Sequence, residues 1–120
     1  MKLTLFILIL MAIFSSCAVA DEWYAGGTLH QATVLQWKSA SPDNRLATSA
    51  DWFTLLTKRF NQSLQKEMDS LNNDQYLSFL KYNSRRLEQC VSQRAGSQYA
   101  NGSGRIVDYA VTCYKNLFGL

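Results

Sequence analysis

The chain has 120 residues, with 12 lysines and arginines against 9 aspartates and glutamates and a formal net charge of +3. So small a basic excess argues against a dedicated nucleic-acid-binding protein, which carries a strongly basic surface. The length is enough for one small domain with a single core.

The first twenty residues have the composition of an export signal. Lys2 supplies the positive charge, residues 3–14 form an apolar run, and Ala18-Val19-Ala20 offers the small residues that a signal peptidase recognises. The apolar run is too short for a comfortable membrane span. We therefore predict a cleaved signal peptide, a mature helical domain at 21–120, a periplasmic or secreted location and no stable membrane insertion after cleavage.

The chain contains three cysteines, and one of them, Cys17, lies inside the predicted signal. A lipoprotein signal, with Cys17 as the lipidated residue, is the alternative to cleavage after Ala20. The other two, Cys90 and Cys113, form an even pair, which in an exported protein indicates a structural disulfide. Closing a loop of this length stabilises a small domain by about 3 kcal/mol. The C-x-x-C spacing of a redox pair is absent, as is the spacing of a metal site.

Residues 41–71 carry the clearest helical pattern in the sequence. Their apolar side chains recur at steps of three, four or seven, which places them on one face of an amphipathic helix. Ser41 is a good N-cap, and Pro42, the single proline, suits the first helical position. We predict a helix here, with Asn61-Gln62-Ser63 as the place where it can break. Its apolar face consists of Leu46, Ala50, Phe53, Phe60, Leu64, Met68 and Leu71.

Three further helices are predicted around this one. The sequence Thr28-Leu29-His30-Gln31 has the form of a capping box, which predicts a first helix over about 29–39. Helical periodicity predicts a third helix over about 75–93 and a fourth over about 105–118. Residues 95–104, rich in Gly and Ser, are expected to form a flexible loop between them. The predicted fold is therefore all-α: a small irregular four-helix bundle with a disulfide-linked C-terminal helical hairpin.

The sequence contains no recognisable catalytic constellation. His30 is the single histidine, and we expect it to lie at the surface or half-buried. Motifs of nucleophilic hydrolases, zinc peptidases and phosphate-binding loops are absent. We therefore predict that the protein is not an enzyme and uses no cofactor and no metal ion.

The aromatic content points to a protein that works by contact. Three tryptophans and six tyrosines are more than one small core easily hides. Trp23 and Tyr24 lie in a glycine-containing arm, where they either cover the core as a lid or form an exposed recognition patch. Trp52 is a further candidate for protein contact. We expect other proteins as partners, or a second copy of the chain in a homodimer, and no nucleic acid.

Charged residues suggest two further properties. Asp51 and Asp108 lie close to apolar faces and are candidate pH-sensitive acids, because burial favours the neutral carboxyl group. Basic residues of the second and third predicted helices and the following loop can combine into a surface for an acidic protein or an anionic lipid, or can simply keep the helices soluble. These residues are Lys58, Arg59, Lys66, Arg85, Arg86, Arg94 and Arg105.

The export signal, the helical hairpin and the predicted Cys90–Cys113 disulfide resemble the small helical proteins of the bacterial periplasm. The general plan is similar to the HdeA/HdeB acid-stress chaperones, which are about this size, all-helical and stapled by one disulfide. The bridge of that family joins distant parts of the chain, whereas Cys90 and Cys113 close a short hairpin, so no functional residue is transferred.

The resemblance implies a chaperone-like periplasmic protein whose apolar surface is exposed when acid protonates carboxylates such as Asp51 or Asp108. The alternative hypothesis is an inhibitor or immunity protein that blocks one secreted enzyme. The segment 44–52, NRLATSADW, has the character of a family signature, although the sequence attaches no function to it.

Overall fold

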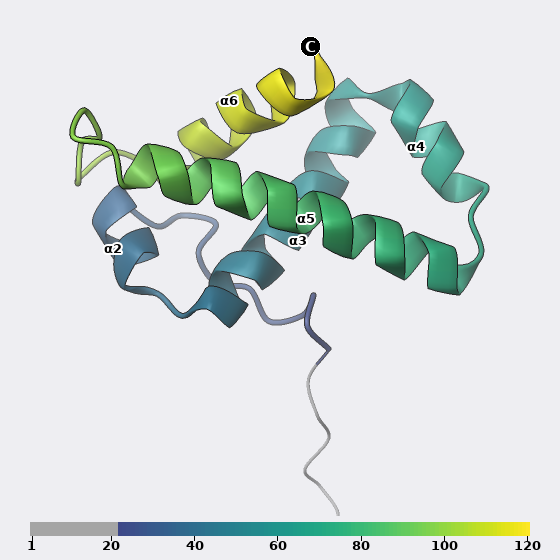
Figure 1. Ribbon diagram of the computed structural model, residues 1–120, viewed down its shortest axis with the longest axis horizontal. Helices are drawn as coiled ribbons and strands as arrows, with labels where there is room; N and C mark the ends of the chain where they lie inside the picture. The colour runs from purple at the N-terminus through teal and green to yellow at the C-terminus, as the bar shows by residue number, and fades with distance from the viewer. Residues whose placement is uncertain (1–21) are drawn as a thin grey trace, which may run out of the picture.

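The computed structural model describes residues 22–120, and the predicted signal peptide with Cys17 lies outside the described residues. The described part of the chain is all-α, as predicted, and packs five helices together (Figure 1). Its single β-bridge, between Thr33 and Arg105, is isolated. The helices are α2 (Val34–Ser39), α3 (Pro42–Phe60), α4 (Gln62–Asp69), α5 (Asn73–Ala95) and α6 (Ile106–Phe118).

The stretch 41–71 forms two helices, α3 and α4, because Asn61 ends one and begins the next. Its backbone, at φ −139° and ψ 72°, is not helical, and its side chain accepts a hydrogen bond from the Leu64 N–H as the N-cap of α4. The predicted break point is therefore correct. Ser41 caps α3 and Pro42 is its first residue, also as predicted.

The predicted start of the first helix is wrong. The helix begins at Val34 instead of Leu29, and the capping box is formed by Thr33 and Gln36. The physical reason is that the N–H groups of Thr28 and Leu29 donate to side chains of α3. The chain before α2 is therefore tied to a neighbouring helix in a non-helical conformation.

α3 and α5 cross at the centre of the molecule and make its most extensive helix–helix contact (Figure 1). Arg45 contacts Glu88, and Phe53 contacts Phe79, so the two helices run in roughly opposite directions. Apolar side chains from α2 and α6 complete the core around this crossing. The largest fully buried apolar side chains are Trp37, Tyr114, Phe53, Met68, Leu87, Ile106, Val34 and Val91.

Two serines lie at the crossing of α3 and α5, one on each helix, between the Arg45–Glu88 contact and the Phe53–Phe79 contact. Ser49 and Ser84 are completely buried, and neither hydroxyl has a hydrogen-bond partner. Small side chains at a helix crossing let the two backbones approach closely. We infer that these positions require a small side chain and gain nothing from its hydroxyl group.

α6 turns back along α5, and the predicted disulfide between the two helices is present. Cys90 and Cys113 are bonded, with their Cα atoms 5.9 Å apart. A second link joins α6 to α3, because the hydroxyl groups of Tyr114 and Thr57 lie 2.8 Å apart in the core. The last helix is therefore held on both sides.

We expect the double variant Cys90→Ala/Cys113→Ala to fold but to lose about 3 kcal/mol of unfolding free energy, because its unfolded chain is no longer constrained. Urea unfolding of the oxidised wild type and the variant measures this difference. The reduced wild type is the matched control and should unfold with the variant. Equal midpoints for oxidised wild type and variant would contradict the assignment.

We expect Ser84→Ala to leave the unfolding free energy unchanged or to raise it by up to about 1 kcal/mol, because it removes a buried hydroxyl group without a partner. Ser84→Leu should instead lower it by about 1–3 kcal/mol by forcing the helices apart. Both changes can be measured by urea unfolding. A clear loss of stability in Ser84→Ala would show that the hydroxyl group has a partner.

Candidate functional site

The arm that precedes α2 lies against α3, and two adjacent glycines allow it to do so. Gly26 has a φ of +81°, a left-handed conformation that other residues rarely adopt. At Gly27, an added Cβ atom would lie 2.5 Å from the backbone nitrogen of Thr48. Gly26 therefore turns the chain, and Gly27 brings the arm into contact with α3.

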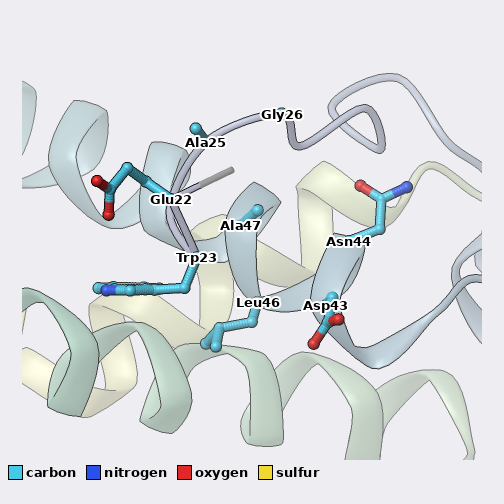
Figure 2. A pocket seen from close by; sticks show the side chains of 8 residues that line it. All are labelled: Glu22, Trp23, Ala25, Gly26, Asp43, Asn44, Leu46 and Ala47. Carbon is cyan, nitrogen blue, oxygen red and sulfur yellow. The ribbon is translucent and has the colours of Figure 1, made fainter. Parts of the chain in front are cut away.

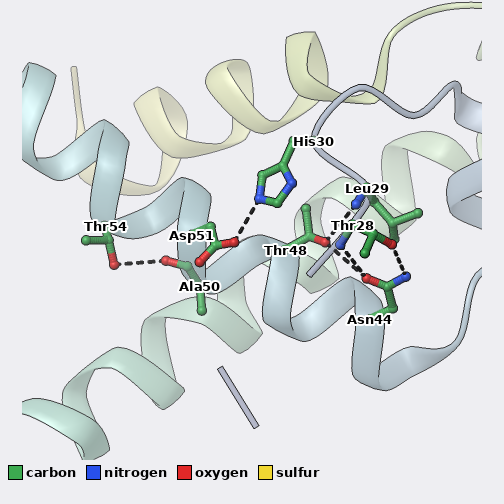
Figure 3. A network of polar contacts seen from close by, with 8 residues as sticks. All are labelled: Thr28, Leu29, His30, Asn44, Thr48, Ala50, Asp51 and Thr54. Atoms are coloured by element: carbon green, nitrogen blue, oxygen red, sulfur yellow. Dashed lines mark hydrogen bonds and ion pairs between the residues drawn. The ribbon is translucent and has the colours of Figure 1, made fainter. Parts of the chain in front are cut away.

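Polar side chains of α3 then bind the backbone of the arm (Figure 3). The Thr28 N–H donates to Asn44 Oδ1 at 2.9 Å, and Asn44 Nδ2 donates back to Thr28 Oγ1 at 2.8 Å. The Leu29 N–H donates to Thr48 Oγ1 at 3.2 Å. These side chains satisfy backbone groups that no helix or sheet satisfies at this point.

One turn further along α3, Asp51 contacts the single histidine. His30 Nε2 lies 2.8 Å from Asp51 Oδ2, and both side chains are partly exposed. The edge of the His30 ring also faces Trp52, with the ring centroids 6.3 Å apart. No hydroxyl or thiol group within residues 22–120 is hydrogen-bonded to the His30 ring. The geometry therefore supports a structural role, in which the pair fastens the arm to α3.

The contacts of the arm explain why the segment 44–52 stands out in the sequence. Asn44, Thr48 and Asp51 are spaced by four and three residues, so they lie along one side of α3. That side is the one that the arm occupies (Figure 3). Sequence reasoning missed the network because its partners lie sixteen or more residues away, although the i, i+4, i+7 row of polar residues was a usable signal.

Trp52 was predicted as a contact residue, and this prediction is wrong. Its side chain is 3 % exposed and stacks on Trp37, with the ring centroids 5.4 Å apart. Trp37 Nε1 donates to Ser92 Oγ, which donates to the Glu88 carboxylate at 2.7 Å. Trp52 follows the arm-binding row by one residue, and this position turns it into the core.

Trp23 and Tyr24 are half-buried and pack against the core, with their rings in an edge-on contact at 5.3 Å. They therefore cover the core and also keep part of their surface exposed. A cleft of about 510 Å³ opens beside Trp23, between the arm and the start of α3 (Figure 2). Its walls include Leu46 and two carboxylates, Glu22 and Asp43.

Asp108 was the second candidate for pH sensitivity. It lies exposed in the first turn of α6, 3.7 Å from the Arg105 guanidinium. Neither Asp108 nor Asp51 is buried, although Asp51 lines a pocket together with Ala50, Tyr76 and Leu80. The pH sensitivity of both acids stays a prediction. Both acids lie on the exposed side of their helices, because nearby positions such as Ala110 and Trp52 form the buried side.

The loop between α5 and α6 projects from one end of the molecule beside α2 (Figure 1). The sequence predicts a flexible loop, yet its backbone is held in place. The Val34 N–H donates to the Gly104 carbonyl at 2.9 Å, and the Leu35 N–H donates to the Gly102 carbonyl at 3.1 Å. The first amides of α2 have no partner inside the helix, and they therefore hold the C-terminal half of the loop in place.

This loop carries the most exposed large apolar side chain of the described residues. Tyr99 is 87 % exposed, and Leu35, which lies under the loop, is 62 % exposed. The Tyr99 N–H donates to Ser97 Oγ, and Asn101 Oδ1 accepts from both the N–H and the hydroxyl group of Ser103. The loop is therefore ordered by its own side chains on both sides of Tyr99.

Comparison of the chain with protein-family models, curated protein sequences and solved structures found no match. Within residues 22–120, no group of three or more His, Cys, Asp or Glu side chains is placed to hold a metal ion. The same residues include no helix that is both long and apolar enough to cross a membrane. The disulfide is typical of proteins that fold in an oxidising compartment.

We expect Gly27→Ala to lower the unfolding free energy by about 1–3 kcal/mol, because the added methyl group overlaps the α3 backbone. Urea unfolding measures the change. Gly96→Ala is the matched control: its added Cβ atom meets no atom closer than 3.4 Å, so its effect should be small. Similar stabilities for the two variants would contradict the close approach of the arm.

Proposed function

We propose that the chain is an exported protein-binding protein that contacts its partner through the end of the molecule formed by α2 and the α5–α6 loop. The observation that carries this proposal is the 87 % exposure of Tyr99 on a loop whose backbone is already ordered. Tyrosine is among the residues that contribute most to protein interfaces. An ordered loop also loses less conformational entropy on binding than a flexible one.

The shape of this end favours an inhibitor or immunity protein. The α5–α6 loop, which carries the exposed Tyr99, projects from one end of the molecule (Figure 1), and the exposed Leu35 side chain lies beside Gly102 of the same loop. A projecting loop with an exposed aromatic side chain complements a concave pocket, and the active sites of enzymes are concave and largely apolar. The partner that this geometry fits best is therefore a secreted enzyme whose pocket accepts the Tyr99 ring.

A chaperone-like function is the second candidate, and the contact between His30 and Asp51 is the observation that favours it. This contact fastens the arm beside Trp52, whose ring faces that of His30 and stacks on Trp37. A chaperone-like function in acid would require this contact to break. If the arm then left α3, the two tryptophans would form an exposed apolar surface that many unfolded proteins can bind.

Affinity capture from the producing cell's exported proteins tests the first candidate. We expect the oxidised domain 21–120 to retain one stoichiometric partner at neutral pH. Tyr99→Ala should weaken this complex by about 2 kcal/mol or more, which is roughly 30-fold in Kd, as for a central interface residue. Leu55→Ala is the matched control, since Leu55 is also well exposed but lies on α3, and it should bind like wild type.

The same experiment at acid pH separates the two candidates. Many partners retained only in acid, together with binding of an apolar dye by Asp51→Asn at neutral pH, would favour the chaperone-like function. A single neutral-pH partner that binds Tyr99→Ala and wild type equally would contradict the proposed contact surface.

A further inference from the structure

A basic strip runs along the exposed side of α5. Its residues are Ser78, Lys81, Tyr82, Arg85, Arg86 and Gln89, which follow one another at steps of one or three and line a shallow groove of about 390 Å³. No acidic residue lines this groove. The strip therefore presents three positive charges, Lys81, Arg85 and Arg86, within about two turns of one helix.

Aromatic rings hold two of these cations in position. Lys81 Nζ lies 5.6 Å from the centroid of the Trp23 ring, and Arg86 Cζ lies 5.6 Å from the ring centroids of both Tyr82 and Phe118. Within residues 22–120, none of the three cations of the strip forms an ion pair. Lys81 and Arg86 are therefore placed by cation–π contacts, and Arg86 also donates a hydrogen bond to Asn83 Oδ1 at 3.2 Å. All three positive charges remain available to an acidic partner.

The cleft beside the arm carries the opposite charge. Glu22 and Asp43 line it, and neither forms an ion pair with another described residue. The cleft adjoins the basic strip, because Trp23 lines the cleft and contacts Lys81. Figure 2 shows α5 running past Trp23 and Leu46 along the edge of the cleft.

We propose that this face binds a second copy of the chain, with the acidic cleft of each protomer on the basic strip of the other. Two oppositely charged patches that lie side by side are self-complementary about a two-fold axis, since one rotation pairs acid with base twice. Such complementarity fixes the orientation of the partners, and the half-exposed Trp23 and the Tyr82 ring, 64 % exposed, supply apolar contact between the charged groups.

This inference is independent of the proposed function. Tyr99 and Leu35 belong to neither patch, so the dimer would leave both α5–α6 loops exposed and would present two copies of the contact surface. A partner that offers two sites would then be held more tightly by the dimer than by a single protomer.

Sedimentation velocity of the oxidised domain 21–120 tests the dimer. We expect a concentration-dependent dimer at about 20 mM salt that weakens strongly at about 500 mM salt, because exposed charges are then screened. Lys81→Glu/Arg85→Glu should weaken the dimer at least about tenfold in Kd, and so should Glu22→Lys/Asp43→Lys, because each places like charges in contact.

Mixing the two variants gives the decisive result. Glu22→Lys/Asp43→Lys has a basic cleft and a basic strip, whereas Lys81→Glu/Arg85→Glu has an acidic cleft and an acidic strip. The mixture therefore restores both contacts, and we expect a heterodimer with a Kd within about threefold of wild type. Circular dichroism of each variant alone shows whether it is folded.

A matched control excludes simple attraction between oppositely charged proteins. Lys58→Glu/Lys66→Glu changes the net charge equally but alters exposed residues of α3 and α4. It should dimerise like wild type by itself, and it should bind Glu22→Lys/Asp43→Lys at least about tenfold more weakly than Lys81→Glu/Arg85→Glu does, because only one of the two contacts then pairs opposite charges. A wild type that stays monomeric up to about 1 mM at low salt would overturn the proposal. A dimer that is indifferent to both reversals would also overturn it.

Discussion

Residues 27–35 form little regular structure, yet three other parts of the molecule depend on where they lie. Gly27 touches the α3 backbone, the carbonyl of Ala32 accepts from the Ile106 N–H at the start of α6, and the first amides of α2 bond to the α5–α6 loop. The hydrogen bonds satisfy backbone groups at helix ends and in an irregular segment, which would otherwise need water or another neighbour as a partner. The Gly27 contact positions this segment, and the segment in turn positions the α5–α6 loop. The position of Tyr99 on that loop therefore depends on the contact of Gly27 with α3.

The aromatic residues divide into two groups with different roles. Most are used internally: Trp37 stacks on Trp52, and Phe53, Tyr114 and Phe118 pack against one another where α3 meets α6. A smaller group remains at the surface, with Tyr82 beside the cations of α5 and Tyr99 on its own loop. The high aromatic content thus supports the core first, and only the exposed residues bear on binding. The two exposed sites lie on different elements, which allows two contacts at once.

The sequence was informative wherever the signal is local. Ser41 and Pro42 mark a helix start by their own chemistry, Asn61 marks a break, and two cysteines in an exported chain indicate a disulfide. The sequence pattern led to a wrong prediction where a partner far away in the sequence determines the local structure. Thr28 and Gln31 fit a capping box, but the Thr28 N–H donates to Asn44 on another helix. The burial of Trp52 and the ordered α5–α6 loop were missed for the same reason, since both are set by residues far away in the sequence.

The backbone bonds that tie α2 to the α5–α6 loop join residues about seventy positions apart, and this separation sets the order of assembly. The Val34 N–H donates to the Gly104 carbonyl, and the Ile106 N–H donates to the Ala32 carbonyl. A chain that is still being synthesised lacks these partners until all but its last helix has emerged. The start of α2 therefore lacks these partners during synthesis, and its docking on the α5–α6 loop, a closure that is costly in entropy, is a late step of folding.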